Sequence, residues 1–418
     1  MIYLMKINSF VKNYHNWNMQ LILFSVVLIS SMIRVRSSTI QQIPVIAFML
    51  FVIFLDGFLK GKRIYLLIGL SVIMLVSLFA NGVLVMKDVF LWFFPYIAIY
   101  YVVSRGGFNY RYLYLFVSLT LVWYLLKNPD TVTYLPNKMM INVYGEGTKH
   151  GTAKLGIILF TTAFYIMYLR WRLSMDIKYT DIICLLFGGY LIFFSSSRSA
   201  ILSVLASIIL LFVNLNGLKK WRTWILFWLF NLSTYFLEIL TAYSDYIRKY
   251  PLVSELVHVD NFEKSYGVTS GRSWLWGYHI DTFLKHPIFG GGRKYVDFSV
   301  NDYIPDLGII AKAGSESPFT GMLASNGLIG VLQIAFVVYL FHKAVKAKNV
   351  MGTVIMFCCI YNTTMGINFL NNRNECVLMT ALYYMSFYDN RLLVYPSALL
   401  KKLKDFKKKL FLRATYSS

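Results

Sequence analysis

The chain has 418 residues, of which 57% are hydrophobic and only 14% are charged. In soluble globular domains roughly a quarter of the residues are charged, so this composition excludes an ordinary soluble fold. The net charge of +22 does not indicate nucleic acid as a partner, because the basic residues lie between apolar runs and not on one soluble face. We therefore predict an integral membrane protein.

The first apolar run follows Lys6 and Lys12 and covers 17–33. No small-residue cleavage site follows it, so we interpret it as a retained membrane span and not as a signal peptide. Similar runs recur along the chain and predict an all-α membrane protein of about twelve transmembrane helices. The predicted spans are 17–33, 43–59, 64–80, 89–103, 112–126, 153–169, 181–196, 199–214, 223–242, 318–341, 350–368 and 375–394.

Lysine and arginine in the connections set the expected orientation. Every second short connection carries at least two of them, and the tail from Arg391 carries eight, which predicts that both termini are cytoplasmic. Residues 1–242 then hold nine spans, 243–317 form a large outside loop, 318–395 hold three spans, and 396–418 form a basic cytoplasmic tail. A smaller outside connection covers about 127–152.

The cysteines do not predict a metal site. Their positions show neither CxxC nor Cys/His ligand spacing, and we interpret them as small core residues. The chain also has no DxD, Walker or HExxH pattern, so we predict no cofactor, no nucleotide site and no metal. The four cysteines are Cys184, Cys358, Cys359 and Cys376.

The large loop is predicted to contain a short helix. Thr269 or Ser270 is a suitable cap, Arg272 lies in the first turn, Pro287 ends the helix, and Gly290–Gly292 turn the chain. Two interpretations stay open: Arg272 binds phosphate beside the positive helix end, or the helix lies in the interface with its arginine among lipid headgroups. The predicted apolar stripe consists of Trp276, Ile280, Phe283 and Leu284.

Two further charged residues lie next to apolar runs. Arg198, in SSSRSA, is either a functional residue or an arginine that snorkels at an outer turn. Glu316 precedes the helix start at Ser317 and Pro318, where it is either a site residue or a partner of the helix dipole. Small residues follow every three positions, which we interpret as helix packing: Gly321, Ala324, Gly327 and Gly330.

Two polar patches in outside turns are candidate substrate contacts, with a solvated loop as the alternative interpretation. The first contains Glu146, Lys149 and His150, and the second contains Asn371, Asn372 and Arg373.

These motifs together resemble the bacterial O-antigen polymerase and O-antigen ligase superfamily of polytopic membrane glycosyltransferases. The resemblance rests on SSSRSA at a span boundary, on GRSWLWGYHIDTFLKHPIFGGG in the large loop, and on Glu316 ahead of Gly327 in the next span. It covers about Ser195 to Leu340 by motif, and the remainder by topology. It implies a GT-C-like architecture in the bacterial inner membrane, with a periplasmic large loop.

The resemblance implies a glycosyl transfer between oligosaccharides carried on undecaprenyl diphosphate, with a chain-length regulator protein as a candidate partner. It assigns the diphosphate to Arg198 and Arg272, with Arg293 as a third ligand, and the role of general base to Glu316. Arginine suits diphosphate because its planar fork binds phosphate oxygens in pairs and stays charged.

Ligases of the superfamily carry a histidine where this chain has Glu316, whereas polymerases often carry a glutamate in an SES-like context. The chain therefore resembles a polymerase more closely than a ligase that transfers glycan to the lipid A core. A lipid-linked oligosaccharide flippase or other transporter is a second alternative, which predicts more charges at mid-span positions than the few present, mainly Asp56 and Glu238.

Overall fold

The computed structural model describes the chain in separate stretches, and the account below is confined to them. The described stretches are residues 71–82, 132–135, 138–141, 149–172, 174–195, 197–214, 217–236, 272–292, 302–304, 309–311, 318–364 and 374–387, with a few isolated positions near them. The predicted spans 17–33, 43–59 and 112–126, and the basic tail, lie outside these residues.

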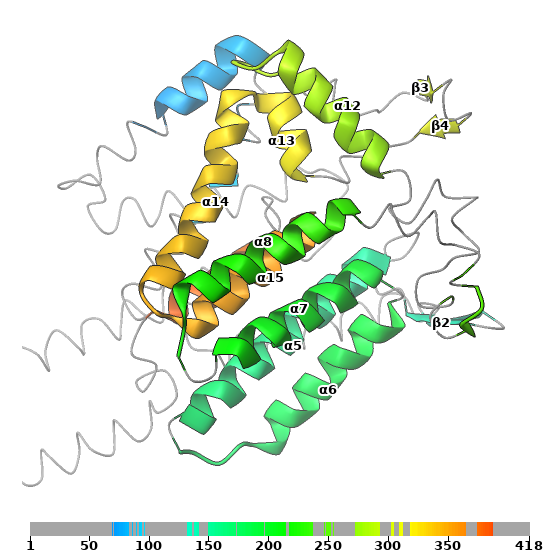
Figure 1. Ribbon diagram of the computed structural model, residues 1–418, viewed down its shortest axis with the longest axis vertical. Coiled ribbons are helices and arrows are strands. Elements are labelled where there is room, and N and C mark those ends of the chain that lie inside the picture. The colour runs from blue at the N-terminus through cyan, green and yellow to red at the C-terminus, as the bar shows by residue number, and fades with distance from the viewer. Residues whose placement is uncertain are drawn as a thin grey trace, which may run out of the picture.

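Four helices in chain order form one part of the bundle, and each begins within a few residues of a predicted span. They are α5 (Lys149–Arg172), α6 (Tyr179–Phe194), α7 (Arg198–Asn214) and α8 (Lys220–Phe236). Short turns connect α5 to α6 and α6 to α7, so successive helices run in opposite directions. The start of α5, the end of α6 and the start of α7 therefore lie at the same end of the bundle (Figure 1).

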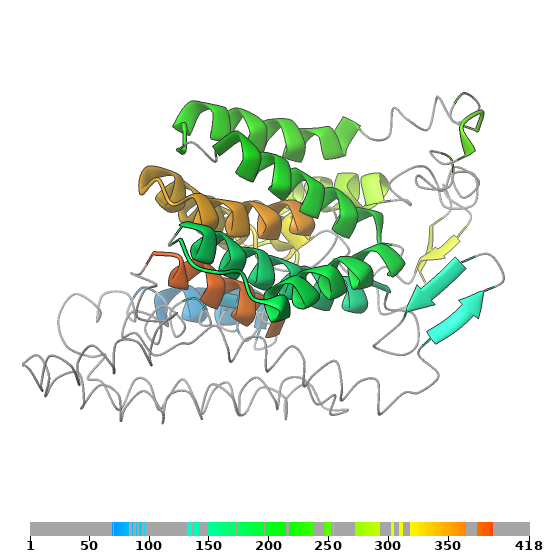
Figure 2. The same ribbon diagram turned by 90° about the horizontal axis from the view of Figure 1, so that it is seen from below.

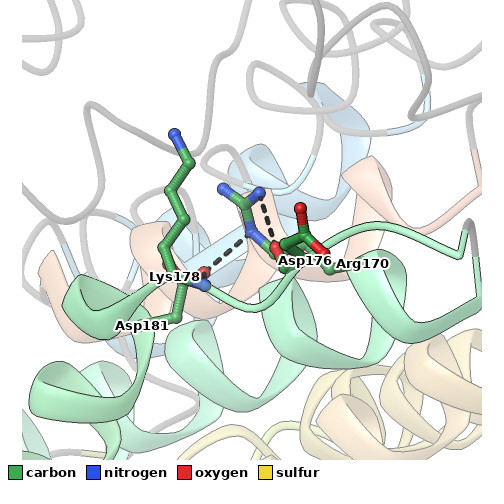
Figure 3. Close-up of polar contacts among 4 residues, drawn as sticks. All are labelled: Arg170, Asp176, Lys178 and Asp181. Atoms are coloured by element: carbon green, nitrogen blue, oxygen red, sulfur yellow. Dashed lines mark hydrogen bonds and ion pairs between the residues drawn. The ribbon is translucent and has the colours of Figure 1, made fainter.

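A buried ion pair fixes the turn between α5 and α6 (Figure 3). Arg170 Nε lies 2.7 Å from Asp181 Oδ2, and both side chains are almost fully buried. The same carboxylate accepts a hydrogen bond from the Lys178 amide, and Arg170 donates to the Asp176 carbonyl. Two charges buried this deeply are tolerated only as a pair, so the contact sets the angle between the two helices.

Helix α15 (Val350–Thr364) lies at the centre of the fold, and its residues from Met351 onward are buried. It packs against α7, α8, α14 (Leu328–Lys346) and α16 (Asn374–Met385). Figure 2 shows α15 between these elements, seen from below. Within the described residues, α16 ends at Met385, before the predicted end of the span 375–394 and ahead of Asp389 and Arg391 in the sequence.

The predicted single span over 318–341 is wrong. The structure has two helices there, α13 (Pro318–Asn326) and α14, separated by Gly327 with φ of +56°. Figure 1 shows α13 folded back beside α14 from this break. Hydropathy alone misses the break because the run stays apolar throughout; its cause lies in a distant loop described below.

Two short antiparallel hairpins accompany the helices in the predicted outside connections. One pairs β1 (Val132–Leu135) with β2 (Lys138–Ile141), and the other pairs β3 (Asp302–Ile304) with β4 (Ile309–Ala311). Both views place the two hairpins at the same end of the molecule (Figures 1 and 2). The predicted helical class therefore holds for the bundle, and the outside connections add these strands.

Among the described residues, two helices are long and apolar enough to cross a membrane: Ala153–Arg172 within α5, and α14. Four shorter apolar helices accompany them: Ser71–Gly82, Tyr179–Phe194, Ser199–Asn214 and Val350–Thr364. Large apolar side chains such as Leu186, Phe193 and Phe212 are more than 60% exposed on helices of this group. Apolar outer surfaces of this kind match a lipid environment, whereas the count of twelve spans stays a prediction.

Candidate functional site

The predicted loop helix is present as α12 (Arg272–Lys285). It begins at Arg272, just after the predicted cap, and ends before Pro287, as expected from a residue that cannot continue a helix. The predicted apolar stripe is only partly correct: Trp276 is buried, but Ile280 and Leu284 are 43% and 69% exposed. The buried face instead contains Leu275, Trp276, His279 and Thr282.

Helix α12 packs alongside α13, and the two run in the same direction (Figure 1). His279, in the middle of α12, bonds to Thr320 in the first turn of α13, with 3.0 Å between Nδ1 and Oγ1. The segment after α12 then contacts the end of α13. The parallel pair therefore places the start of α12, at Arg272, at the same end as the start of α13.

The segment Ile288–Gly292 contacts the helix break at Ala324–Leu328; we call this the loop–break contact. The Gly291 and Gly292 amides donate to the carbonyls of Ala324 and Ser325, at 2.7 and 3.2 Å. In return, the Leu328 amide donates to the Ile288 carbonyl at 3.0 Å. A helix end leaves backbone groups without helical partners, and the loop supplies partners to both helices at the break.

Glycine is required on both sides of this contact. Gly290 has φ of +76°, and a Cβ there would overlap the Ser325 carbonyl. Gly327 has φ of +56°, and its Cβ would lie 2.5 Å from the Gly290 nitrogen. Residues other than glycine rarely adopt such φ values, so the two glycines permit both the turns and the close approach of the two segments. The predicted role of Gly327 in close packing is confirmed, but the close contact occurs at a helix break and not along a continuous helix.

Asn81, at the end of the helix Ser71–Gly82, joins the same contact. Its amide nitrogen donates to the Phe289 carbonyl, and at 3.5 Å to the Ser325 carbonyl. One side chain thus connects an early helix, the large loop and the end of α13.

His279 is fully buried and forms its bond to Thr320 through Nδ1. Its second ring nitrogen, Nε2, is buried and has no hydrogen-bond partner within the described part of the chain. Burial lowers the pKa of the imidazole to about 4, because the charged form loses its hydration. The ring is therefore neutral at physiological pH.

Serines surround the start of α7. Ser195, Ser197 and Ser199 are buried on either side of Arg198, and the hydroxyls of Ser197 and Ser199 lie 3.2 Å apart. One turn further along, the Ser203 hydroxyl donates to Asn362 Oδ1 on α15 at 2.8 Å. The backbone that carries Arg198 is thereby attached to the central helix.

The structure places three of the six predicted site residues by their backbone alone. Arg198 begins α7, Arg272 begins α12, and His150 lies in the first turn of α5. Because α5 and α7 begin at the same end of the bundle, His150 and Arg198 share that end. The other three predicted site residues lie outside the described residues: Arg293, Glu316 and Arg373.

Sequence reasoning missed Asn81 and His279. Asn81 follows an apolar helix of no apparent function, and nothing local links it to a loop more than 200 residues away. The sequence did carry a signal for His279. It lies three or four residues from Leu275, Trp276 and Thr282, which are buried, and this spacing places all four residues on one face of the helix.

Comparison with known families gives one result. The profile of the family described as O-antigen ligase (Wzy_C) matches residues 183–335, just over a third of the chain. The match supports a relationship to the O-antigen ligase and polymerase superfamily of membrane enzymes, without separating its two activities. It includes Arg198, Arg272, Arg293 and Glu316, but neither His150 nor Arg373. No curated protein matches the chain.

Proposed function

We propose that this protein of the bacterial inner membrane polymerises lipid-linked oligosaccharide repeat units into a long O-antigen or capsular polysaccharide. The substrates are oligosaccharides on undecaprenyl diphosphate, and the reaction takes place on the periplasmic face. The match to the superfamily supports the substrate class, and Glu316, in place of the ligase histidine, favours polymerase.

The observation that carries this proposal is the parallel packing of α12 on α13. It joins the helix that begins with Arg272 to the helix that Glu316 precedes, and the loop–break contact fixes their relative position. Phosphate-binding and proton-accepting groups are the two that a glycosyl transfer with a diphosphate leaving group requires.

In the proposed reaction, Glu316 accepts the proton of a sugar hydroxyl on the acceptor repeat unit. The hydroxyl oxygen attacks the anomeric carbon of the donor glycan, and the bond from that carbon to the diphosphate oxygen breaks. The electron pair leaves with undecaprenyl diphosphate, whose growing negative charge is stabilised by Arg198 and Arg272, with Arg293 as a third ligand. No strong acid is required, because diphosphate is a good leaving group.

The test is the polysaccharide made by a strain that depends on this protein. Glu316→Gln and Arg272→Ala should each reduce long polymer to single repeat units on a gel, with the protein still present in the membrane. Asp281→Asn is a matched control, because Asp281 is exposed on α12 and pairs only with Lys285 one turn away in the contacts described. A normal polymer ladder from both site variants would refute the proposal.

Ligase activity is the second candidate, favoured by the description of the matching family. The phenotype of a strain without the protein separates the two. Loss of a polymerase leaves one repeat unit on the lipid A core, whereas loss of a ligase leaves full-length polymer on the carrier lipid.

A further inference from the structure

The bond between His279 and Thr320 has no part in the steps of the proposed reaction. A buried polar atom without a partner costs about 1–3 kcal/mol, and His279 Nε2 is such an atom within the described residues. A leucine would fill similar space without this cost. An apolar residue could not form the directional bond that His279 makes through Nδ1, which indicates a role for that bond.

The place of the bond suggests what that role is. His279 lies seven residues after Arg272 in α12, about 10 Å along the helix axis. Thr320 is the third residue of α13 and lies four positions after Glu316. The pair is thus a polar contact between the middle of α12 and the first turn of α13.

Two polar contacts join α12 and the segment after it to α13. The loop–break contact lies at the far end of α13, at Ala324–Leu328. The bond between His279 and Thr320 lies in the first turn of α13, beside the buried side chains of Leu275 and Trp276 on α12. A second directional contact at this end adds to the first in limiting the movement of one helix against the other.

We propose that His279 and Thr320 form a positioning pair that holds the start of α12, which Arg272 begins, against the first turn of α13 during glycosyl transfer. The inference rests on the proposed function and deepens it. Neither residue touches substrate in this proposal; the pair acts through the two helices. Errors of about 1 Å in the placement of reacting groups can reduce turnover by about a hundredfold.

The neutral state of the ring fits this role. The lowered pKa of His279 keeps the imidazole uncharged at physiological pH, and the Thr320 hydroxyl can donate to Nδ1 or accept from it. The bond therefore persists in either tautomer of the ring.

The experiment uses the full-length protein in proteoliposomes with a lipid-linked repeat unit, and measures kcat and KM separately. His279→Leu and Thr320→Val each remove the bond and keep the side-chain volume. Each should lower kcat about 10- to 100-fold, with KM for the donor changed less than about threefold. Thr320→Ser retains the hydroxyl and should restore most of kcat. The double variant His279→Leu/Thr320→Val should be no slower than either single variant, because both remove one bond.

Three outcomes would overturn the proposal: kcat within twofold of the parent in Thr320→Val, failure of Thr320→Ser to restore it, or additive losses in the double variant. Thr320→Val keeps the inference testable if His279→Leu fails to fold, because it exchanges one hydroxyl for a methyl group. Arg272→Ala and Glu316→Gln are assayed in parallel. If these two retain polymer formation, the proposed function itself is wrong; if they abolish it while the pair has no effect, only the positioning role is wrong.

Discussion

Replacement of Gly290 by alanine tests whether the loop–break contact holds the site together. Alanine at φ of +76° costs about 1–2 kcal/mol in backbone strain. Its Cβ also overlaps the Ser325 carbonyl, and because that atom belongs to the backbone it cannot rotate away. Relief of such overpacking typically costs about 1–3 kcal/mol more. We therefore expect Gly290→Ala to weaken the contact by about 2–5 kcal/mol.

Gly277→Ala is the matched control for this prediction. Gly277 is the sixth residue of α12, thirteen residues before Gly290, and a Cβ there would meet no atom within 4 Å. Alanine in a helix interior is favoured over glycine by about 0.5–1 kcal/mol, so this variant should be as stable as the parent or slightly more stable.

The measurement is thermal unfolding of the purified protein in detergent, together with the length of polysaccharide made in cells. Gly290→Ala should lower the midpoint by about 5 °C or more and shorten the polymer. Gly277→Ala should change neither. Equal stability of Gly290→Ala and the parent, or equal loss in both variants, would refute the argument from the glycine geometry.

Three further predictions concern buried polar contacts. Arg170→Met should destabilise the protein by about 3–5 kcal/mol, because it leaves Asp181 buried without its partner, and Arg170→Met/Asp181→Asn should recover most of the loss in a thermal unfolding assay. Asn362→Leu should cost about 0.5–1.5 kcal/mol by removing the bond to the Ser203 hydroxyl, which keeps the Ala200 carbonyl as an acceptor, and Ser203→Ala in the same chain should add little to that loss. Acid should loosen the packing of α12, because the pKa of His279 falls from 6.5 to about 4 on folding. The contribution of the neutral His279 ring to folding stability is complete above pH 6.5 and is lost as the pH falls toward 4, up to about 3 kcal/mol. Hydrogen exchange of α12 amides measures this loss, and His279→Leu should reduce it; the described residues of α13 contain no titratable side chain.

Local signals predicted the limits of the helices well. The predicted start beside Arg272 and the stop at Pro287 agree with the bounds of α12, and Pro318 begins α13. These signals act within one turn of the chain, so a sequence displays them completely. The turn at Gly290 was visible for the same reason, as three consecutive glycines.

The buried face of α12 was harder to predict, because the usual rule selects the most apolar stripe for the core. In this helix Ile280 and Leu284 are exposed, whereas His279 and Thr282 are buried, and His279 bonds to α13. A helix beside a membrane can present apolar side chains outward and satisfy polar ones inside the protein. Apolar periodicity then indicates that a helix exists, but not which face packs.

The break at Gly327 explains why α13 and the large loop belong to one unit. An unbroken helix over Pro318–Lys346 would be about 43 Å long, well beyond the hydrocarbon thickness of about 30 Å. The start of α13 would then lie far from the other helices. The break folds α13 back beside α14 and returns the start of α13 toward the other helices (Figure 1).

Such a break exposes backbone groups that lipid cannot satisfy, and an apolar span tolerates it only where protein supplies the partners. Ile288, Gly291 and Gly292 supply them from the loop, on the same segment that extends α12. One set of hydrogen bonds therefore both stabilises the helix break and holds the segment after α12 against α13. Any change that releases the loop should therefore displace α12 relative to α13, even though the contact lies after the end of α12.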